Sequence, residues 1–417
     1  VTGGARGGPA KIAIISSGLY GTMSGSPTSD VVATGSITIP VMKRLGYKAR
    51  FAGAVEVAAS TGGSAMPPIM GSAAFIMAEY SGISYNAIVL AALIPALLYY
   101  MGVFTQVHFR AVKYDLRPSQ DEIPTTKETF RTGWVFLLPI IGIIVALILG
   151  YSPTFTAGVG VLVTILASMI LKQTRMSLWA MVEGLGTTTL QILPVAGACA
   201  AAGLVIGGLS MTGLGMKSAN VILTVSNAQP LLTLVIAAVV TIVLGLGMPT
   251  PSAYILAAVL VGPALSKLGF PLLPSQMFLL YYAILSALTP PIAVAAIAAS
   301  AIADDDPFKI AFSAVRLAIV GFLLPFAFVW NPGIVLELGP LANTLAVIGA
   351  VAGALAVSAS MEGFIKTQLS SLERGLLTIF AIGAVSPYFA VSIVCTLLII
   401  ALVGRQALLK EEVPASG

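Results

Sequence analysis

Charge is scarce in this sequence. Asp, Glu, Lys and Arg make up 9% of its 417 residues, whereas a soluble globular domain has about 25%. Hydrophobic residues make up 58%, and the mean hydropathy is +1.00. Apolar segments of about 18 residues or more, enough for a transmembrane helix, recur along the chain, whereas the alternating pattern of an outer-membrane barrel is missing. The composition excludes a soluble protein and predicts an all-α polytopic membrane protein.

Histidine and cysteine are nearly absent. The single histidine, His108, ends an apolar span, and the two cysteines, Cys199 and Cys395, lie within apolar runs without metal-ligand spacing. We expect an interfacial histidine and buried thiols rather than a metal centre or a disulfide. Without clustered His or Cys or paired midplane carboxylates, the sequence also argues against an enzyme.

The net charge of +5 does not indicate a nucleic-acid partner. The Lys and Arg residues lie in short loops beside apolar spans, where retention on the cytoplasmic side explains them. We therefore expect the protein to lie in the lipid bilayer and to have no nucleic-acid partner.

The sequence contains an internal repeat of roughly a hundred residues. A break at Ser24-Gly25-Ser26-Pro27-Thr28 recurs within Gly245-Leu246-Gly247-Met248-Pro249-Thr250-Pro251-Ser252, and Pro27 and Pro249 are 222 positions apart. A second break, Met66-Pro67-Pro68-Ile69, recurs as Thr289-Pro290-Pro291-Ile292, and Pro67 and Pro290 are 223 positions apart. Each repeat thus interrupts two hydrophobic runs at matching places.

The first break joins two apolar arms, at about 11–23 and 29–44. Neither reaches the roughly 20 residues needed to cross a bilayer, so the pair predicts a re-entrant helical hairpin with its tip near the midplane. Its base carries Lys43, Arg44, Lys48 and Arg50, which the positive-inside rule places in the cytoplasm. The second repeat has only Lys267 at that place, which favours the opposite topology.

These patterns predict an inverted-repeat protein with two re-entrant hairpins and two broken transmembrane helices. The segment 375–403 is either one kinked span or a hairpin, and Arg405 and Lys410 near its end favour the hairpin. The predicted organisation is repeat 1 at 1–110 (hairpin 11–45, broken helix 51–80, span 87–108), a cytoplasmic loop at 111–131, scaffold spans at 132–217, repeat 2 at 218–330 (hairpin 231–265, broken helix 276–303, span 310–330) and extra C-terminal spans at 331–417.

The chain opens at Val1, without an initiator Met or a signal peptide, and leads quickly into repeat 1. Repeat 2, by contrast, is preceded by several spans. We therefore expect this chain to be the later part of a longer polypeptide.

Each of the four breaks is expected to place a positive helix start and negative carbonyl and hydroxyl groups near the midplane of the membrane. Each following half-helix begins with unpaired N–H groups and a partial positive charge of about half a unit. Freed carbonyls and hydroxyls of the preceding half-helices suit a small hard cation such as Na⁺. The pattern predicts a secondary transporter that holds an anionic substrate and a coupling ion between its repeats. The residues expected at the substrate are Ser26, Pro27, Thr28, Asp30, Pro67, Pro249, Thr250 and Pro290.

Asp30 is the acidic residue close to a hairpin tip. An intramembrane carboxylate is costly and is a functional candidate by default. It could carry a proton, join a cation site or cap a backbone turn.

Three other charged side chains have expected positions. Glu56 is expected at the membrane interface because it lies nearer its helix start, and Arg316 is expected either to snorkel or to pair with an acidic group. Asp306 is expected to cap the helix that begins at Phe308.

At these residues the chain resembles the large membrane subunit of TRAP (tripartite ATP-independent periplasmic) transporters. The motifs that carry the resemblance are Ser24 to Thr28, Ile39 to Lys43, Leu45-Gly46-Tyr47, Gly62-Gly63, Pro67 to Gly71, Gly245 to Thr250 and Leu288 to Pro291. The resemblance covers about 11–330. Met248-Pro249-Thr250-Pro251, Asp30 and the extra C-terminal spans look more like the branch with fused membrane subunits and TAXI-type binding proteins.

The resemblance implies an elevator-type importer of organic acids in the inner membrane of a bacterium or archaeon. A periplasmic substrate-binding protein would deliver the substrate, an ion gradient would drive uptake, and a small membrane subunit would be fused or separate. Asp30 stands where the family more often has a small residue, which opens H⁺ as an alternative to Na⁺. The implied ion ligands are Ser24, Ser26, Thr28, Gly63, Ser64 and Met66 in one site and Gly247, Thr250, Ser286, Leu288 and Thr289 in the other.

Two other membrane transport functions fit the same architecture. A symporter that needs no binding protein, like those of the divalent-anion:sodium family, shares the two hairpins, and a solute channel also accommodates re-entrant segments. Gradient-driven accumulation and dependence on a binding protein distinguish the three.

Overall fold

The computed structural model describes residues 6–116, 133–171 and 174–408, and all regular structure in these ranges is helical. This confirms the predicted all-α class. Three helices are long and apolar enough to cross a membrane, namely α5 (Tyr85–Lys113), α18 (Pro340–Glu362) and most of α20 (Phe389–Leu408), and two further bent pairs satisfy the same test. The chain is therefore a multi-pass membrane protein. Most of the expected loop at 111–131 lies outside the described residues.

The first repeat-like stretch folds into a helical hairpin followed by a broken helix. Gly25, with φ of +65°, ends the first arm, and Ser26 and Pro27 begin the second, because Ser is a strong N-cap and Pro is favoured in the first helical turn. The helices are α1 (Gly8–Ser24), α2 (Pro27–Arg44), α3 (Ala49–Gly63), α4 (Gly71–Ser81) and then α5.

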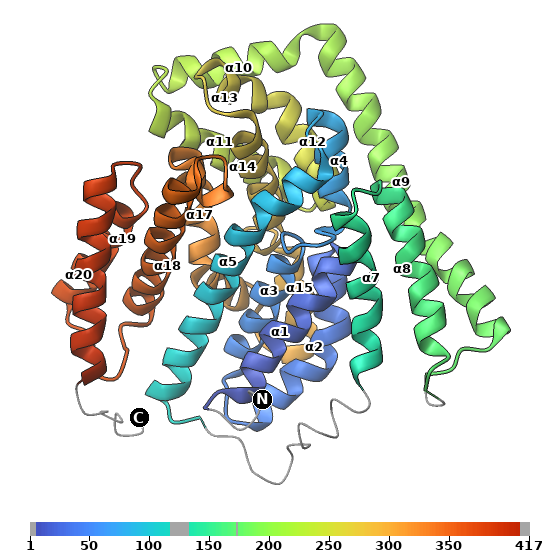
Figure 1. Ribbon diagram of the computed structural model, residues 1–417, viewed down its shortest axis with the longest axis horizontal. Helices are drawn as coiled ribbons and strands as arrows, with labels where there is room; N and C mark the ends of the chain where they lie inside the picture. Colours follow the sequence, from blue (N-terminus) through green and yellow to red (C-terminus); the bar gives the residue numbers. More distant parts are fainter. Residues whose placement is uncertain (1–5, 117–132, 172–173, 409–417) are drawn as a thin grey trace.

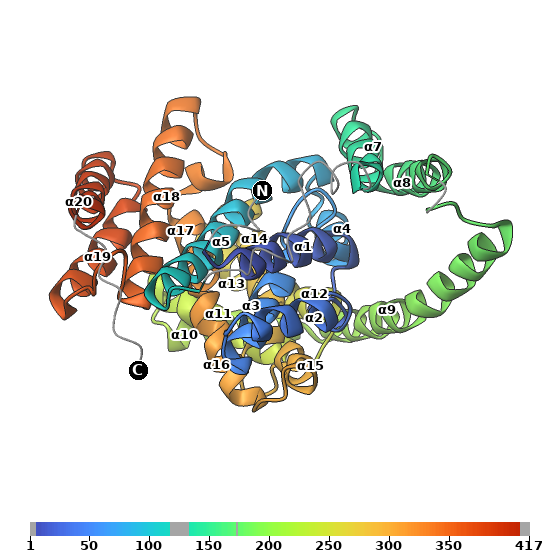
Figure 2. The same ribbon diagram turned by 90° about the horizontal axis from the view of Figure 1, so that it is seen from below.

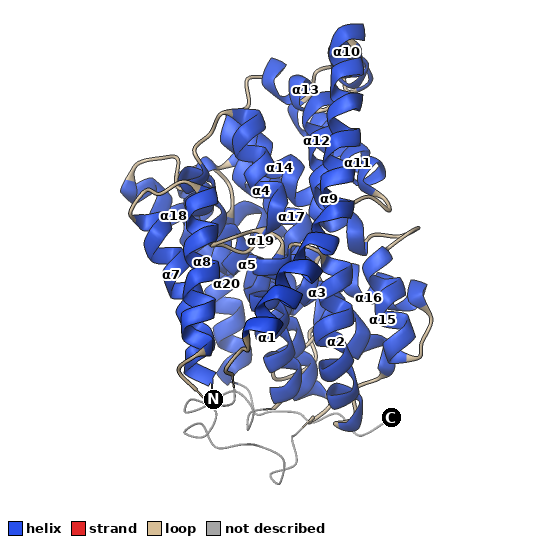
Figure 3. Ribbon diagram, turned by 90° about the vertical axis from the view of Figure 1, so that its right-hand side faces the viewer, coloured by secondary structure: helices blue, strands red, loops and turns tan. Residues whose placement is uncertain are grey.

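The second repeat-like stretch follows the same order. Its helices are α10 (Leu214–Val225), α11 (Pro230–Gly245), α12 (Thr250–Leu260), α13 (Gly262–Lys267), α14 (Leu272–Leu285), η3 (Ser286–Leu288), α15 (Val294–Ala303), α16 (Pro307–Leu317) and α17 (Ile319–Trp330). In Figure 1 and Figure 3 the hairpin of α1 and α2 lies in the lower half of the molecule, and that of α11, α12 and α13 lies in the upper half.

In each stretch, the half-helix that follows the break packs against helices of the other stretch. Helix α15, which follows the break of the second stretch, packs against α2 and α3 of the first. Helix α4, which follows the break of the first stretch, packs against α12 and α14 of the second. Helices α5 and α17 also pack together, so one buried apolar core runs through both stretches.

The remaining helices lie around this core. Helices α7 (Leu137–Ile148) and α8 (Pro153–Ser168) pack on each other after the short η2 (Trp134–Phe136), and the long α9 (Leu178–Thr212) runs along the edge to α12 (Figures 1 and 2). After η4 (Pro332–Val335), α18 packs against α5 and against α19 (Ser371–Ala384). Helices α19 and α20 are separate and packed together, so this region forms the hairpin rather than one kinked span.

Candidate functional site

The tip of the first hairpin is held by side chains from its own turn. The Ser24 hydroxyl donates to Asp30 Oδ1 and accepts from the backbone N–H of Ser26 at 3.1 Å. The Ser26 hydroxyl in turn accepts from the Ser29 N–H and caps α2. Ser26, rather than Asp30, is therefore the cap at this turn, and Asp30 is a fully buried carboxyl one turn inside α2.

The first broken helix touches this hairpin at two pairs of glycines. A Cβ on Gly63 would lie 2.5 Å from the Gly21 Cα, and a Cβ on Gly25 would lie 2.4 Å from the Gly71 Cα. Because both contacts involve backbone atoms, only glycine lets the hairpin and the break approach this closely. The structure thus places Gly63 against α1, near the tip.

Three buried side-chain oxygen atoms of the first hairpin and its broken helix have no hydrogen-bond partner. A Cβ on Gly21 would lie 2.9 Å from Asp30 Oδ2, which has no partner, and the hydroxyls of Thr61 and Ser64 on the broken helix are also unpartnered. Buried polar atoms in proteins are nearly always hydrogen-bonded, so such atoms point to a ligand. Carboxylate and hydroxyl oxygens are ligands suited to a hard cation.

Four contacts at this break were not predicted. The Thr22 hydroxyl donates to the carbonyl of Met66, and the Tyr85 hydroxyl lies 2.9 Å from the Pro68 carbonyl and 2.6 Å from the Ile69 carbonyl. Gly63 O accepts from the Met66 N–H at 3.0 Å. Several carbonyls that the break removes from helical hydrogen bonds are thus satisfied within the protein.

Tyr85→Phe is expected to lower the free energy of unfolding by about 1–2 kcal/mol, because it leaves break carbonyls without their donor. Thermal unfolding in detergent measures the change. Tyr151→Phe is the matched control, since Tyr151 is exposed and the substitution keeps its ring contact with Phe155. Equal stability of the two variants would show that Tyr85 does not hold the break.

The tip and break of the second stretch are joined by Ser286. Its buried hydroxyl lies 3.1 Å from the carbonyl of Gly245, the last residue of α11, and 2.7 Å from that of Ala283. Thr289 donates to the Leu285 carbonyl at 2.7 Å. Gly247 has φ of +75° and lies beside Ile292 of the break. The structure therefore brings Gly247 and Ser286, two of the predicted ion ligands, to one tip-and-break contact.

The half-helices after the breaks differ in how they begin. Helix α2 has a side-chain cap, whereas α4, α12 and α15 have none. The first N–H groups of a helix lack intrahelical partners, and the helix dipole places positive charge there. Three helix starts thus carry uncapped donors suited to an anion.

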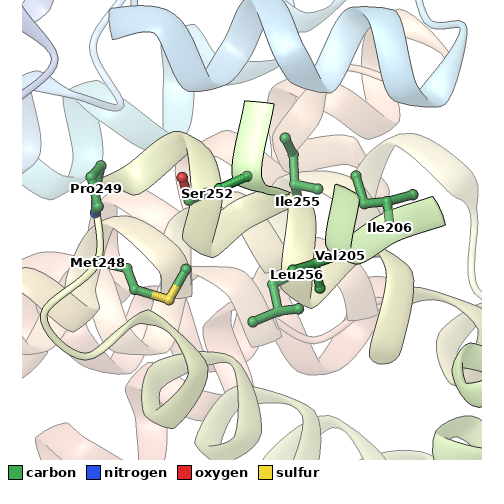
Figure 4. Close-up of a pocket in the computed structure, with 8 residues that line it drawn as sticks. Val205, Ile206, Met248, Pro249, Ser252, Ile255 and Leu256 are labelled. Carbon is green, nitrogen blue, oxygen red and sulfur yellow. The ribbon is translucent and has the colours of Figure 1, made fainter. Parts of the chain in front are cut away.

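Two pockets adjoin the tips and breaks. One, of about 260 Å³, lies between α9 and the second hairpin and is lined by Val205, Ile206, Met248, Pro249 and Ser252, among others (Figure 4). The other, of about 430 Å³, is lined by Met66 and Pro67 with side chains of α1 and α5. Pro67 and Pro249, expected at one substrate site, thus line two separate pockets.

Two expectations about single side chains are wrong, and one of two alternatives for a third is wrong. Glu56 is fully buried, not interfacial, because α1 and α2 pack over α3. Arg316 is exposed and donates to the backbone carbonyl of Met361, so only its pairing with an acidic group is wrong and snorkelling stays a prediction. Cys199 and Cys395 are half-buried free thiols rather than fully buried ones. The cap by Asp306 is confirmed, since its carboxylate accepts from the N–H groups of Phe308 and Lys309.

Comparison with known proteins identifies two similarities. Residues 1–339 match the family described as the DctM component of the tripartite ATP-independent periplasmic transporter. Over 167 residues the chain is 27% identical to the uncharacterized protein YgiK of Salmonella typhimurium. That alignment covers 39% of this chain and 38% of the relative.

Proposed function

This chain belongs to the DctM component family of TRAP transporters, and from this premise we propose that it imports a small organic acid anion across the inner membrane of a bacterium or archaeon. In this proposal a periplasmic binding protein delivers the anion and an ion gradient drives an elevator motion of the hairpins. A small membrane subunit, fused or separate, completes the assembly, which belongs to the TAXI-type branch.

The observation that carries the proposal is the pair of hairpin tips, each packed against a broken helix. Three uncapped helix starts supply donors for a carboxylate, and the unpartnered oxygens of Asp30, Thr61 and Ser64 supply acceptors for a cation. Donor groups for an anion and acceptor groups for a cation suit a transporter that moves an anion together with a cation. The exchange of α4 and α15 between the stretches supports an inverted-repeat origin.

The coupling ion is proposed to be Na⁺ at the two tip-and-break contacts. In this assignment Ser24, Ser26, Thr28, Gly63, Ser64 and Met66 hold one ion, and Gly247, Thr250, Ser286, Leu288 and Thr289 hold the other. The substrate-facing residues remain Ser26, Pro27, Thr28, Asp30, Pro67, Pro249, Thr250 and Pro290. Since Pro67 and Pro249 line separate pockets, the proposal requires hairpin movement to bring them to one substrate.

Thr28→Ala and Thr250→Ala are each expected to raise the ion concentration for half-maximal uptake about tenfold, the effect of losing about 1.4 kcal/mol of binding. Ion-dependent uptake into proteoliposomes measures this. Ser36→Ala is the control, because Ser36 is an exposed residue of the same helix α2 as Thr28. Unchanged ion dependence in both threonine variants would remove these ligand sets.

The proposal is tested by uptake of labelled organic acids into proteoliposomes that contain the complete membrane assembly. Candidate binding protein is added outside, and Na⁺ or H⁺ gradients are imposed separately. Accumulation that needs both the binding protein and a gradient supports the proposal. Accumulation without the binding protein indicates a stand-alone symporter, and equilibration without accumulation indicates a channel.

A further inference from the structure

Glu56 lies at the centre of a buried cluster of hydroxyl groups. Its carboxylate accepts from Ser17 on α1 at 2.7 Å and from Ser60 on its own helix at 3.3 Å. Thr34 and Thr38 on α2 each approach it at 2.5 Å, the first at Oε1 and the second at Oε2. Glu56, Ser17 and Ser60 have no exposed surface.

Basic side chains on the elements around α3 are engaged elsewhere or exposed. Lys11 on α1 is bonded to His108, Lys43 on α2 donates to the Ala303 carbonyl, and Arg110 on α5 pairs with Glu362. Among the described residues of α14, η3 and α15 there is no charged side chain. The remaining basic groups on α2, α3 and α16, Arg44, Arg50, Lys309 and Arg316, are exposed.

Within the part of the chain that the structure describes, the titratable groups near Glu56 are therefore not cationic. Asp30 on α2 and Tyr100 on α5 are close enough to Glu56 to interact with it electrostatically, and Tyr99 and Tyr281 interact in turn with Tyr100. The Tyr100 hydroxyl donates to the carbonyl of Ala59 on α3 at 2.7 Å. A buried charge normally has an ionic partner, and an intramembrane carboxylate without one indicates a functional group.

The second stretch builds the same packing without such a cluster. The register that pairs Pro27 with Pro249 places Leu256 and Leu260 at the positions of Thr34 and Thr38. The register that pairs Pro67 with Pro290 places the fully buried Leu279 at the position of Glu56. Since apolar side chains suffice there, the fold itself does not require a carboxylate in the first stretch.

The hydroxyl network accommodates both a charged and a neutral Glu56. Thr34 Oγ1 also lies 2.8 Å from the backbone carbonyl of Asp30 and 3.1 Å from the Ser17 hydroxyl. When Glu56 is ionised, Thr34 donates to it. When Glu56 carries a proton, Thr34 can donate to the Asp30 carbonyl instead and accept the proton of the carboxylic acid.

The space around the carboxyl group favours a proton over a metal ion. A Cβ on Gly35 would lie 3.0 Å from Glu56 Cγ and 3.6 Å from Cδ, so α2 packs directly on this side chain. A proton needs no added volume, whereas a cation needs a shell of oxygen atoms around it.

We propose that Glu56 and its four hydroxyl partners, Ser17, Thr34, Thr38 and Ser60, form a reversible proton-binding site between the first hairpin and α3, separate from the tip-and-break contacts. Its role in transport, which rests on the proposed function, is to carry a proton in addition to the Na⁺ proposed at the tip-and-break contacts. The balance is simple, since one proton adds to the carboxylate oxygen on one side of the membrane and leaves it on the other.

The first test needs no substrate. Infrared difference spectra of the purified full-length protein, recorded as the pH is raised, are expected to show loss of a carboxylic-acid C=O band. Glu56→Gln should remove this band, whereas Glu79→Gln, the same change at an exposed position on α4, should retain it. A band that persists in Glu56→Gln, or a wild type without a titrating band, would overturn the site.

The second test measures transport in proteoliposomes with an organic acid that the wild type accumulates. Glu56→Gln is expected to abolish accumulation driven by a proton gradient, while exchange of labelled for unlabelled substrate stays within about twofold of wild type. Retained proton-driven accumulation would overturn the coupling role. If the wild type accumulates no acid at all, the proposed function fails, while the infrared test still decides the proton site.

Discussion

Gly25→Ala is expected to destabilise the folded protein by about 2–5 kcal/mol. An alanine at φ of +65° costs about 1–2 kcal/mol, and forcing extra volume into a packed contact costs about 1–3 kcal/mol more. The added Cβ would lie 2.4 Å from the Gly71 Cα, a backbone atom that cannot rotate away. Thermal unfolding in detergent, followed by circular dichroism, measures the loss.

Gly82→Ala is the matched control for this prediction. Gly82 has φ of +71°, and its Cβ would meet no atom within 4 Å, so only the backbone term of about 1–2 kcal/mol applies. The difference between the two variants isolates the contact between the tip and the break. If both lose the same stability, Gly25 and Gly71 are not in close contact in the folded protein.

Arg110→Ala is expected to cost about 3–5 kcal/mol, because removing one partner of a buried ion pair leaves the other charge uncompensated. Arg110 Nε lies 3.1 Å from Glu362 Oε2, and the Glu362 side chain is only 2% exposed. The Arg110 guanidinium also lies 4.2 Å from the centre of the Phe51 ring. This residue links α3, α5 and α18, so its loss should loosen the C-terminal helices from the core.

The control is Arg405→Ala, which breaks the pair of Arg405 with Glu373. The Arg405 side chain is 68% exposed, and exposed pairs contribute about 0–1 kcal/mol. Adding Glu362→Gln to Arg110→Ala should recover much of the lost stability, because it removes the unpaired charge. Equal losses for Arg110→Ala and Arg405→Ala, or no recovery in the double variant, would contradict the role of the buried pair.

Sequence patterns predicted the local features of this protein well, because those features have local causes. Low charge and long apolar runs indicated a helical membrane protein. The helix breaks follow from proline and glycine, since Pro27 begins α2 and Gly25 ends α1 with a left-handed residue. The Asp306 cap likewise depends only on the next three residues.

Side-chain environments within the membrane were harder to predict. The position of Glu56 near the start of its helix suggested the interface, but its partners Ser17 and Thr34 lie 39 and 22 positions away in the chain. The sequence pattern of one helix does not reveal which other helices will pack over its side chains. The same reason explains why Tyr85 and Thr22 were missed as donors to the first break.

By itself, the sequence determined the membrane class, the repeated pair of breaks and the family resemblance, because composition, proline positions and spacing are properties of the chain alone. Only the tertiary structure decided that Glu56 is buried among hydroxyls, that glycines let the tip of the first hairpin touch its break, and that Pro67 and Pro249 line different pockets. Those outcomes depend on which helices pack together, and packing joins residues that lie far apart in the sequence.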